Sequence, residues 1–230
     1  MIFTANSIQE IDWRQFRAVI FDLDGTLYDQ RQLRYRMALE LAFYYLVRPH
    51  RFHELKVISA FRRLREKNFE KEVPNLHAAQ YEWVAEKLNL ESGSIQQIVD
   101  FWILKKPLTH LPSCRPHGIV ELFERLRQKN IKIGVFSDHP VIEKLQFLGL
   151  KPDIAASAID PCINRLKPDP KGVLWICEQF QVPTAECLHI GDREERDQAC
   201  AQRAGCASLI LSAENAKKLG SNQFYAKIFP

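Results

Sequence analysis

The chain has 230 residues, of which 46% are hydrophobic and 26% charged, and its formal net charge is +4. A chain of this length can bury one sizeable core, or a core with a smaller inserted domain, and its composition excludes disorder as the dominant state. The modest charge gives no reason to expect nucleic acid as a partner. No apolar stretch approaches the roughly 18 residues of a membrane-spanning helix, so we expect no membrane partner either.

The start of the chain and its cysteines point to a reducing compartment. Residues 1–11 lack the basic and then apolar pattern of a secretory signal, and residues 1–17 form a polar lead-in without a recognisable motif. The six cysteines contain no C-x-x-C pair, which excludes the common zinc and thioredoxin-like spacings. Several lie within apolar stretches, where they are best interpreted as buried thiols. We therefore expect a soluble protein of the cytoplasm.

The first clear element is the apolar run from Ala18 to Phe21, followed by Asp-Leu-Asp-Gly-Thr at residues 22–26. A run this short, rich in β-branched residues and apolar on both faces, predicts a buried strand of a parallel sheet. The alternation of side chains in a strand places Asp22 and Asp24 on the same side. Two carboxylates so close together repel each other, so the pair calls for a cation or a shared proton.

Residues 31–106 show helical spacing of apolar residues and no strand signal. The spacing predicts one helix from about Leu33 to Pro49 and a second over 52–68. A third is expected to end near Ser92-Gly93, and a fourth to run from Ile95 to Trp102. We therefore predict a helical domain at 31–106, inserted between the two parts of a core domain at 1–30 and 107–230.

From Pro116 onward, short apolar strands alternate with amphipathic helices. Pro116 suits the first turn of a helix, which Asn130 would end. The strands are expected at 131–136, 154–159, 187–190 and 207–211, and the helices between them at 141–147, 170–180 and 194–204. This alternation predicts an α/β fold, a doubly wound parallel sheet of the Rossmann-like kind, with the helical domain inserted.

Polar clusters follow several of the predicted strands. Asp22 and Asp24 follow the first strand, Ser137 and Asp138 the second, and Asp192 and Asp197 the strand at 187–190. Lys167 lies between these clusters, in a loop that Pro168 and Pro170 stiffen. Each cluster alone has an ordinary interpretation as a helix cap, a solvated lysine or a charged first helical turn. Because the carboxyl ends of parallel strands lie side by side, their joint occurrence favours one shared site.

These motifs resemble those of the haloacid dehalogenase (HAD) superfamily, in its phosphatase branch with a small α-helical cap. Residues 22–26 are similar to the first motif of that family, Ser137 to the second, Lys167 to the third and Gly191-Asp192-x4-Asp197 to the fourth. The resemblance covers residues 18–211. Two positions depart from it, since Asp138 stands where many relatives have Asn and Arg193 where a small polar residue is common. Both side chains would crowd or charge the mouth of the site and so affect substrate preference.

The resemblance implies a Mg²⁺-dependent phosphatase that hydrolyses a small phosphorylated metabolite. Asp22 would be the nucleophile that forms an aspartyl-phosphate, and Asp24 the general acid and base, while Thr26 holds the turn. The implied metal ligands are Asp22, Asp24 through its backbone carbonyl, Asp192, and Asp197 either directly or through water. The groups implied to bind the phosphoryl oxygens are Lys167, Ser137, and the backbone amides of Leu23, Asp24 and Asp138.

Several alternatives stay open at this point. A phosphomutase would transfer the phosphoryl group again instead of losing it to water, and a binding protein would keep the pocket without turnover. Haloacid dehalogenation and phosphonate cleavage are disfavoured, because neither branch uses a carboxylate like Asp24. His139 either lies at the edge of the pocket or in a surface loop. His189 is interpreted as a buried histidine whose ring nitrogens have hydrogen-bond partners. One of Arg31, Arg34 and Arg36 could read a distal anion of the substrate. The oligomeric state is open between a monomer and a homodimer.

Overall fold

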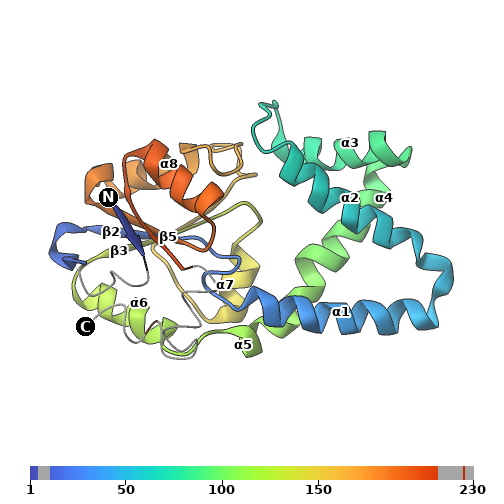
Figure 1. The fold of residues 1–230 in the computed structure, drawn as a ribbon, viewed down its shortest axis with the longest axis horizontal. Coiled ribbons are helices and arrows are strands. Elements are labelled where there is room, and N and C mark those ends of the chain that lie inside the picture. Colours follow the sequence, from blue (N-terminus) through green and yellow to red (C-terminus); the bar gives the residue numbers. More distant parts are fainter. Residues whose placement is uncertain (5–10, 212–224, 226–230) are drawn as a thin grey trace.

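The computed structural model describes residues 1–4, 11–211 and 225, and it has an α/β core beside a group of helices (Figure 1). The core contains one sheet of six parallel strands in the order β1–β6–β5–β2–β3–β4. The strands are β1 (Ile2–Thr4), β2 (Ala18–Phe21), β3 (Lys132–Ser137), β4 (Ile154–Ser157), β5 (Cys187–Gly191) and β6 (Ala207–Ile210). The predicted fold class is confirmed.

Helices cover both faces of the sheet. The side chains of β2 alternate between two apolar cores, with Val19 and Phe21 in one and Ala18 and Ile20 in the other. This explains why β2 is apolar at every position, since both of its faces are buried. The helices on the Phe21 side are α6 (Ile119–Gln128) and α7 (Ile142–Leu148). Those on the Ile20 side are α8 (Lys171–Phe180) and α9 (Ala199–Ala204), the latter preceded by the π-helical turn η7 (Glu194–Gln198).

A helical insertion lies between β2 and β3, and we call it the cap. Residues 30–114 are all described and contain no strand. The cap has a small apolar core of its own, which includes Val57, Phe61, Tyr81 and Val84. Its helices are α1 (Gln30–Val47), η3 (Pro49–Arg51), α2 (His53–Lys67), α3 (Leu76–Leu88), α4 (Ser92–Val99), η4 (Asp100–Lys105), η5 (Lys106–His110) and α5 (Leu111–Cys114). Domain boundaries at residues 30/31 and 106/107 stay a proposal.

Three details predicted from the sequence are wrong. The lead-in contains the edge strand β1, whose three residues are too few to show a periodic signal; residues 5–10 of that lead-in lie outside the described residues. Pro116 precedes its helix instead of opening it, because Gly118, with φ +83°, redirects the chain just before α6. Ser92 begins α4, whereas α3 already ends at Leu88, where Asn89 takes a left-handed conformation.

Two further findings concern membrane-spanning helices and the state of the cysteines. Among the described residues, no helix is both long enough and apolar enough to cross a membrane. All six cysteines are free thiols, and only Cys162 among them is exposed.

Candidate active site

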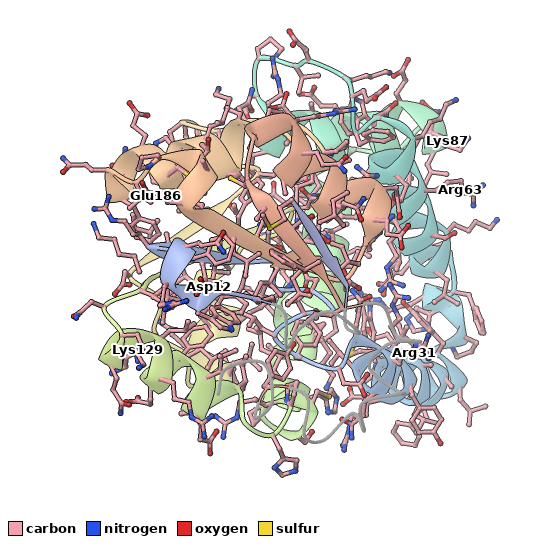
Figure 2. All side chains as sticks on the ribbon, turned by 60° about the vertical axis from the view of Figure 1, so that its left-hand side comes forward. Asp12, Arg31, Arg63, Lys87, Lys129 and Glu186 are labelled. Atoms are coloured by element: carbon pink, nitrogen blue, oxygen red, sulfur yellow. The ribbon has the colours of Figure 1, made fainter. Side chains whose placement is uncertain are left out.

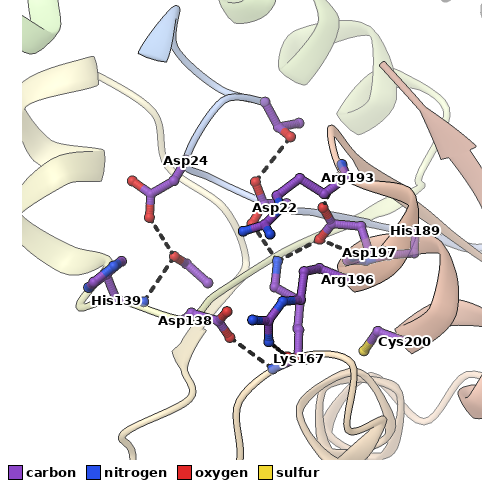
Figure 3. Close-up of polar contacts among 12 residues, drawn as sticks. Asp22, Asp24, Asp138, His139, Lys167, His189, Arg193, Arg196, Asp197 and Cys200 are labelled. Atoms are coloured by element: carbon purple, nitrogen blue, oxygen red, sulfur yellow. Dashed lines mark hydrogen bonds and ion pairs between the residues drawn. The ribbon is translucent and has the colours of Figure 1, made fainter. Parts of the chain in front are cut away.

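The predicted site residues come together at the carboxyl ends of three neighbouring strands (Figure 3). Asp22 directly follows β2, Ser137 ends β3, and Asp192 follows β5. Strand β2 lies between β3 and β5 in the sheet, so these three positions are neighbours although up to 170 residues separate them. Lys167 reaches the same place from the loop before α8, and Asp197 from η7.

Asp22, Asp192 and Asp197 form an acidic cluster. Each offers a carboxylate oxygen, and these oxygens all lie within 4.8 Å of one another. Burial, reinforced by the charge of Asp197, raises the pKa of Asp192 to about 6. Burial and the neighbouring carboxylates likewise hold the pKa of Asp22 well above its usual range, although Lys167 opposes them. The cluster thus has an excess of negative charge, and its hard oxygen donors fit Mg²⁺ better than a soft metal.

Lys167 is buried at the centre of this cluster. Its Nζ donates to Asp22 and, over 2.6 Å, to Oδ1 of Asp197. Burial alone would lower the pKa of Lys167, but these two carboxylates raise it well above its ordinary value. The lysine loop is itself held in place, because the backbone N–H of Lys167 donates to Asp138 and Arg196 donates to the backbone carbonyl of Lys167.

The turn after β2 orients Asp22. Thr26 Oγ1 donates to Oδ2 of Asp22 over 3.1 Å, so Thr26 and Lys167 bind the two different carboxylate oxygens. Gly25 has φ +103°, a conformation that L side chains rarely adopt. A Cβ at that position would also lie only 2.3 Å from Oδ2 of Asp192. Glycine is therefore required where the first and fourth motifs meet.

Asp24 points away from the acidic cluster (Figure 3). Its carboxylate accepts hydrogen bonds from Ser137 Oγ over 3.0 Å, from the hydroxyl of Tyr28 and from Lys144 Nζ. Burial alone would raise the pKa of Asp24, but the ion pair with Lys144 and the other donors lower it below its usual range. Without substrate, Asp24 is therefore an ionised carboxylate, the form that accepts a proton.

Sequence reasoning missed Lys144 and Tyr28. Lys144 lies on α7, three residues after Val141 and four before Leu148, and all three side chains are buried. A lysine on the apolar face of a short helix was a signal that could have found it, since lysine is almost never buried without a partner. Tyr28 gave no such signal, because an aromatic residue after a turn most often serves the core.

The cap closes on the core through the carboxyl end of α2. Arg65 is buried and donates to the backbone carbonyl of Asp138 over 2.7 Å, and its Nη1 lies 3.1 Å from Nδ1 of His139. The next residue, Glu66, accepts from Arg193 over 3.0 Å and from Arg196 over 2.6 Å. Burial alone would raise the pKa of Glu66, but the two arginines lower it to about 2. Arg193 thus binds the cap.

A cavity of about 230 Å³ lies between cap and core. Cap residues such as His77 and Lys105 line one side, and Pro140, Glu143 and Lys144 line the other. Of the residues described above for the site, only Lys144, whose Nζ binds Asp24, also lines this cavity. A volume this small suits a compact substrate group.

The two histidines have different surroundings. His139 is half-buried beside Arg65, and burial together with that arginine holds its pKa well below the ordinary value, so the ring is neutral. His189 is fully buried, as expected, and its Nε2 lies 3.4 Å from Asp197. Its Nδ1 has no hydrogen-bond partner among the described residues, so the expectation that both ring nitrogens find partners is wrong.

Comparisons with known proteins identify the family. The sequence matches the haloacid dehalogenase-like hydrolases over residues 16–205, most of the chain. The protein therefore belongs to the family of haloacid dehalogenase-like hydrolases, and the resemblance read from its motifs is confirmed. The comparison with curated proteins found no match.

Solved structures share this fold at low sequence identity. A 2-haloacid dehalogenase from Pseudomonas syringae has a TM-score of 0.58 at 21% identity, over 85% of this chain and 86% of that one. A β-phosphoglucomutase from Clostridium difficile has a TM-score of 0.59 at 21% identity, over 88% of both chains. The CbbY protein from Rhodobacter sphaeroides, in complex with xylulose-1,5-bisphosphate, has a TM-score of 0.56 at 16% identity, over 86% and 87%. Such different chemistries on one fold leave the reaction to the site residues.

Proposed function

We propose that this hydrolase is a Mg²⁺-dependent phosphatase that removes the phosphoryl group of a small phosphorylated metabolite. The observation that carries the proposal is the contrast between Asp22 and Asp24. Asp22 lies in an acidic cluster suited to a divalent cation, whereas Asp24 lies among proton donors outside that cluster. A reaction that transfers a phosphoryl group and also moves a proton uses both kinds of carboxylate.

Asp22, Asp192 and Asp197 would hold the Mg²⁺ ion, with the backbone carbonyl of Asp24 as a further ligand. When bound, the ion would offset the charge of the attacking carboxylate and of the phosphate dianion. We propose Asp197 as an indirect ligand, since its Oδ1 is already bonded to Lys167. The other binding groups for the phosphoryl oxygens are the ammonium of Lys167, the hydroxyl of Ser137, and the backbone amides of Leu23 and Asp138.

In the first chemical step, an oxygen of Asp22 attacks phosphorus and the bond from phosphorus to the leaving oxygen breaks. Asp24 gives its proton to that leaving oxygen. Because the pKa of Asp24 is lowered before substrate binds, we propose that the incoming dianion draws Lys144 away and so favours the protonated form. In the second step, water attacks the phosphorus of phospho-Asp22, Asp24 takes the proton of that water, and inorganic phosphate and free Asp22 result.

The size of the substrate follows from the cap. Arg65 and Glu66 join cap and core on one side of the site, and the cavity of about 230 Å³ remains for the leaving group. A closed cap also keeps bulk water away while Asp22 is attacking. These features favour a soluble metabolite over a phosphoprotein. The cytoplasmic location proposed from the sequence is supported by six free cysteines, which are typical of a reducing compartment.

A panel of phosphorylated metabolites, incubated with Mg²⁺, tests the proposal. We expect release of inorganic phosphate from some members of the panel, and no release by the Asp22→Asn variant or in the presence of EDTA. An isomerised phosphate ester without free phosphate would indicate a phosphomutase instead. Thermal stabilisation by a metabolite without any turnover would indicate a binding protein, and halide release from a 2-haloacid a dehalogenase.

A further inference from the structure

Helix α1 has apolar side chains on two opposite faces. Leu33, Met37 and Tyr45 are buried against the rest of the protein. On the other side, Tyr35, Leu39, Phe43 and Leu46 recur every three or four residues and are 67%, 55%, 69% and 77% exposed. A helix that is apolar all round is normally buried all round. Figure 1 shows α1 at the margin of the cap, with the other cap helices on one side of it only.

The exposed residues form one continuous row, which we call the α1 stripe. It consists of Tyr35, Leu39, Phe43 and Leu46, and it continues at the end of the helix into Val47, which is 53% exposed. No charged residue interrupts the row between Leu39 and Phe43 on that face. The arginines of this region, Arg31, Arg34 and Arg36, lie toward the beginning of the helix.

The area of the stripe separates it from ordinary surface. Side chains of these types expose about 150–200 Å² each when free, so five of them at these exposures present on the order of 550 Å². The largest apolar patch on a typical monomer is about 300–600 Å². A stable interface of standard size buries about 800 Å² on each partner. The stripe thus lies at the upper end of what a monomer leaves in water, and it supplies roughly two thirds of the area that each partner of a standard dimer buries.

We propose that the α1 stripe is the interface of a homodimer, in which α1 of one copy packs antiparallel against α1 of a second copy. A two-fold interface must be complementary to itself, and the stripe meets this condition. If the axis passes near Leu41, then Leu39 of each copy faces Phe43 of the other, and Tyr35 faces Val47. Ala42 lies exposed at the crossing point, where its small side chain lets the two backbones approach.

The charges at the ends of the stripe make the salt dependence of binding different for a second copy and for an acidic partner. In an antiparallel pair, Arg34 of one copy lies toward Arg48 of the other, so the helices are expected to cross at an angle that leaves both arginines in solvent. The arginines of the two copies then repel each other weakly, and salt screens that repulsion. Binding between copies should therefore be maintained or strengthened at high ionic strength, whereas binding to an acidic protein or to an anionic lipid surface should weaken.

Analytical ultracentrifugation of the full chain between 1 and 100 µM, at low and high salt, provides the first test. We expect a species of twice the 26.8 kDa chain mass, which dissociates on dilution and persists in high salt. Phe43→Glu should give a folded monomer, with at least a hundredfold weaker association. Leu174→Glu is the matched control, because Leu174 is an exposed leucine, 42% exposed, on α8 of the core, and it should leave the dimer intact.

Cross-linking gives a second test, which does not depend on the folding of the Phe43 variant. In a Cys162→Ser background, which removes the exposed native thiol, Ala42→Cys should form an intermolecular disulfide on mild oxidation by diamide, and Arg63→Cys on α2 should not. A chain that stays monomeric at 100 µM, or a dimer that Phe43→Glu leaves intact, would overturn the proposal. So would a monomer that binds vesicles of anionic phospholipid through α1, because the stripe would then face a lipid surface.

Discussion

Asp22 and Asp24 carry the same side chain two positions apart, yet they differ in every contact. Lys167 and Thr26 bind the two oxygens of Asp22, and two further aspartates lie beside it. Ser137, Tyr28 and Lys144 bind Asp24. Because one carboxylate lies among negative charges and the other among donors, their pKa values move in opposite directions. Such a separation is what assigns different roles to two acids of one site.

Replacing Lys144 tests what sets the charge state of Asp24. We expect Lys144→Met to lower the free energy of unfolding by about 2–3 kcal/mol at pH 7, because it leaves a buried carboxylate without its cation. The lowered pKa of Asp24 means that the pair stabilises the protein above the unfolded pKa of about 3.9, and that this contribution is lost as the pH falls through the folded value. At pH 4 the loss caused by the substitution should therefore still be almost complete, and it should become clearly smaller only near pH 2.5.

Urea unfolding of Lys144→Met and of the parent protein, at pH 7 and pH 2.5, measures both quantities. Lys129→Met is the control, because Lys129 is an exposed lysine at the end of α6 on the core surface (Figure 2), and we expect no change at either pH. An equal loss at both pH values for Lys144→Met would show that Lys144 contributes through packing and not through its charge.

For single residues, the sequence identifies candidate site residues only where they belong to a recognisable motif. Asp22 and Asp192 follow strands, Ser137 ends one, and Lys167 lies in a proline-rich loop, as local pattern predicts, whereas the roles of these residues stay predictions. Lys144 and Arg65 were missed, because their importance depends on contacts with residues 120 and 73 positions away. A local sequence pattern does not show which distant residue a side chain will contact.

The carboxyl end of α2 is the element that connects cap and core, and it suggests a kinetic experiment. We expect Arg65→Met to lower kcat/KM by roughly tenfold to a hundredfold, because the cap then loses its hydrogen bond to the loop that follows Ser137 and closes less accurately. Arg63→Met is the matched control on the same helix. Arg63 points outward (Figure 2), where it contacts Ser59 over 3.3 Å, and its loss should leave kinetics unchanged.

Steady-state kinetics on whichever metabolite is turned over best gives the comparison, with circular dichroism as a check on folding. Equal kinetic constants for the two variants would mean that the contact of Arg65 with the core plays no part in catalysis.

The packing of α8 against the sheet gives a test of stability. A Cβ on Gly172 would lie 2.1 Å from Cζ of Phe136, a fully buried ring of β3, so Gly172→Ala should destabilise the protein by about 2–3 kcal/mol. Gly93→Ala is the control within α4, where a Cβ meets nothing within 4 Å, and we expect a gain of up to about 1 kcal/mol. Thermal unfolding of both variants measures the difference, and a stabilised Gly172→Ala protein would contradict the packing described for α8.

Elements were predicted well where their signals are long. The helix α2 and the strand β3 lie within one or two residues of the expected ranges, because each has a full apolar period. The short strand β1 and the true start of α6 were missed. In β1 only three residues pair with β6, and at α6 the left-handed Gly118 overrides the helix-starting preference of Pro116.

For the whole molecule, the alternation of strands and helices predicted a parallel sheet, but not its strand order or the position of the cap. That order follows from which helices pack on which face of β2. The contacts between cap and core join Arg65 to Asp138 and Glu66 to Arg193, pairs that are far apart in the sequence. They form only once both parts have folded, and composition alone does not reveal them.

Metal binding should stabilise the whole molecule. If Mg²⁺ binds the acidic cluster of Asp22, Asp192 and Asp197, an ion concentration a hundredfold above Kd adds about 2.7 kcal/mol to the free energy of unfolding. For a chain of this size, that corresponds to a rise in Tm of roughly 5–10 °C. We expect Asp192→Asn to remove most of this rise while leaving the fold intact, as differential scanning calorimetry with and without Mg²⁺ would show. A full Mg²⁺ shift in that variant would exclude Asp192 as a ligand.

The central claim is that Asp22 receives the phosphoryl group and Asp24 moves the proton, and rapid quenching followed by intact mass measurement tests it directly. With a nitrophenyl phosphate, whose leaving group needs little protonation, Asp24→Asn should accumulate a phosphoryl adduct on the chain, because the water that would remove it has no base. The same variant should fail with alkyl phosphates, and Asp22→Asn should form no adduct with either substrate. An adduct on Asp22→Asn, or equal loss of both substrates at the phosphorylation step in Asp24→Asn, would contradict the account.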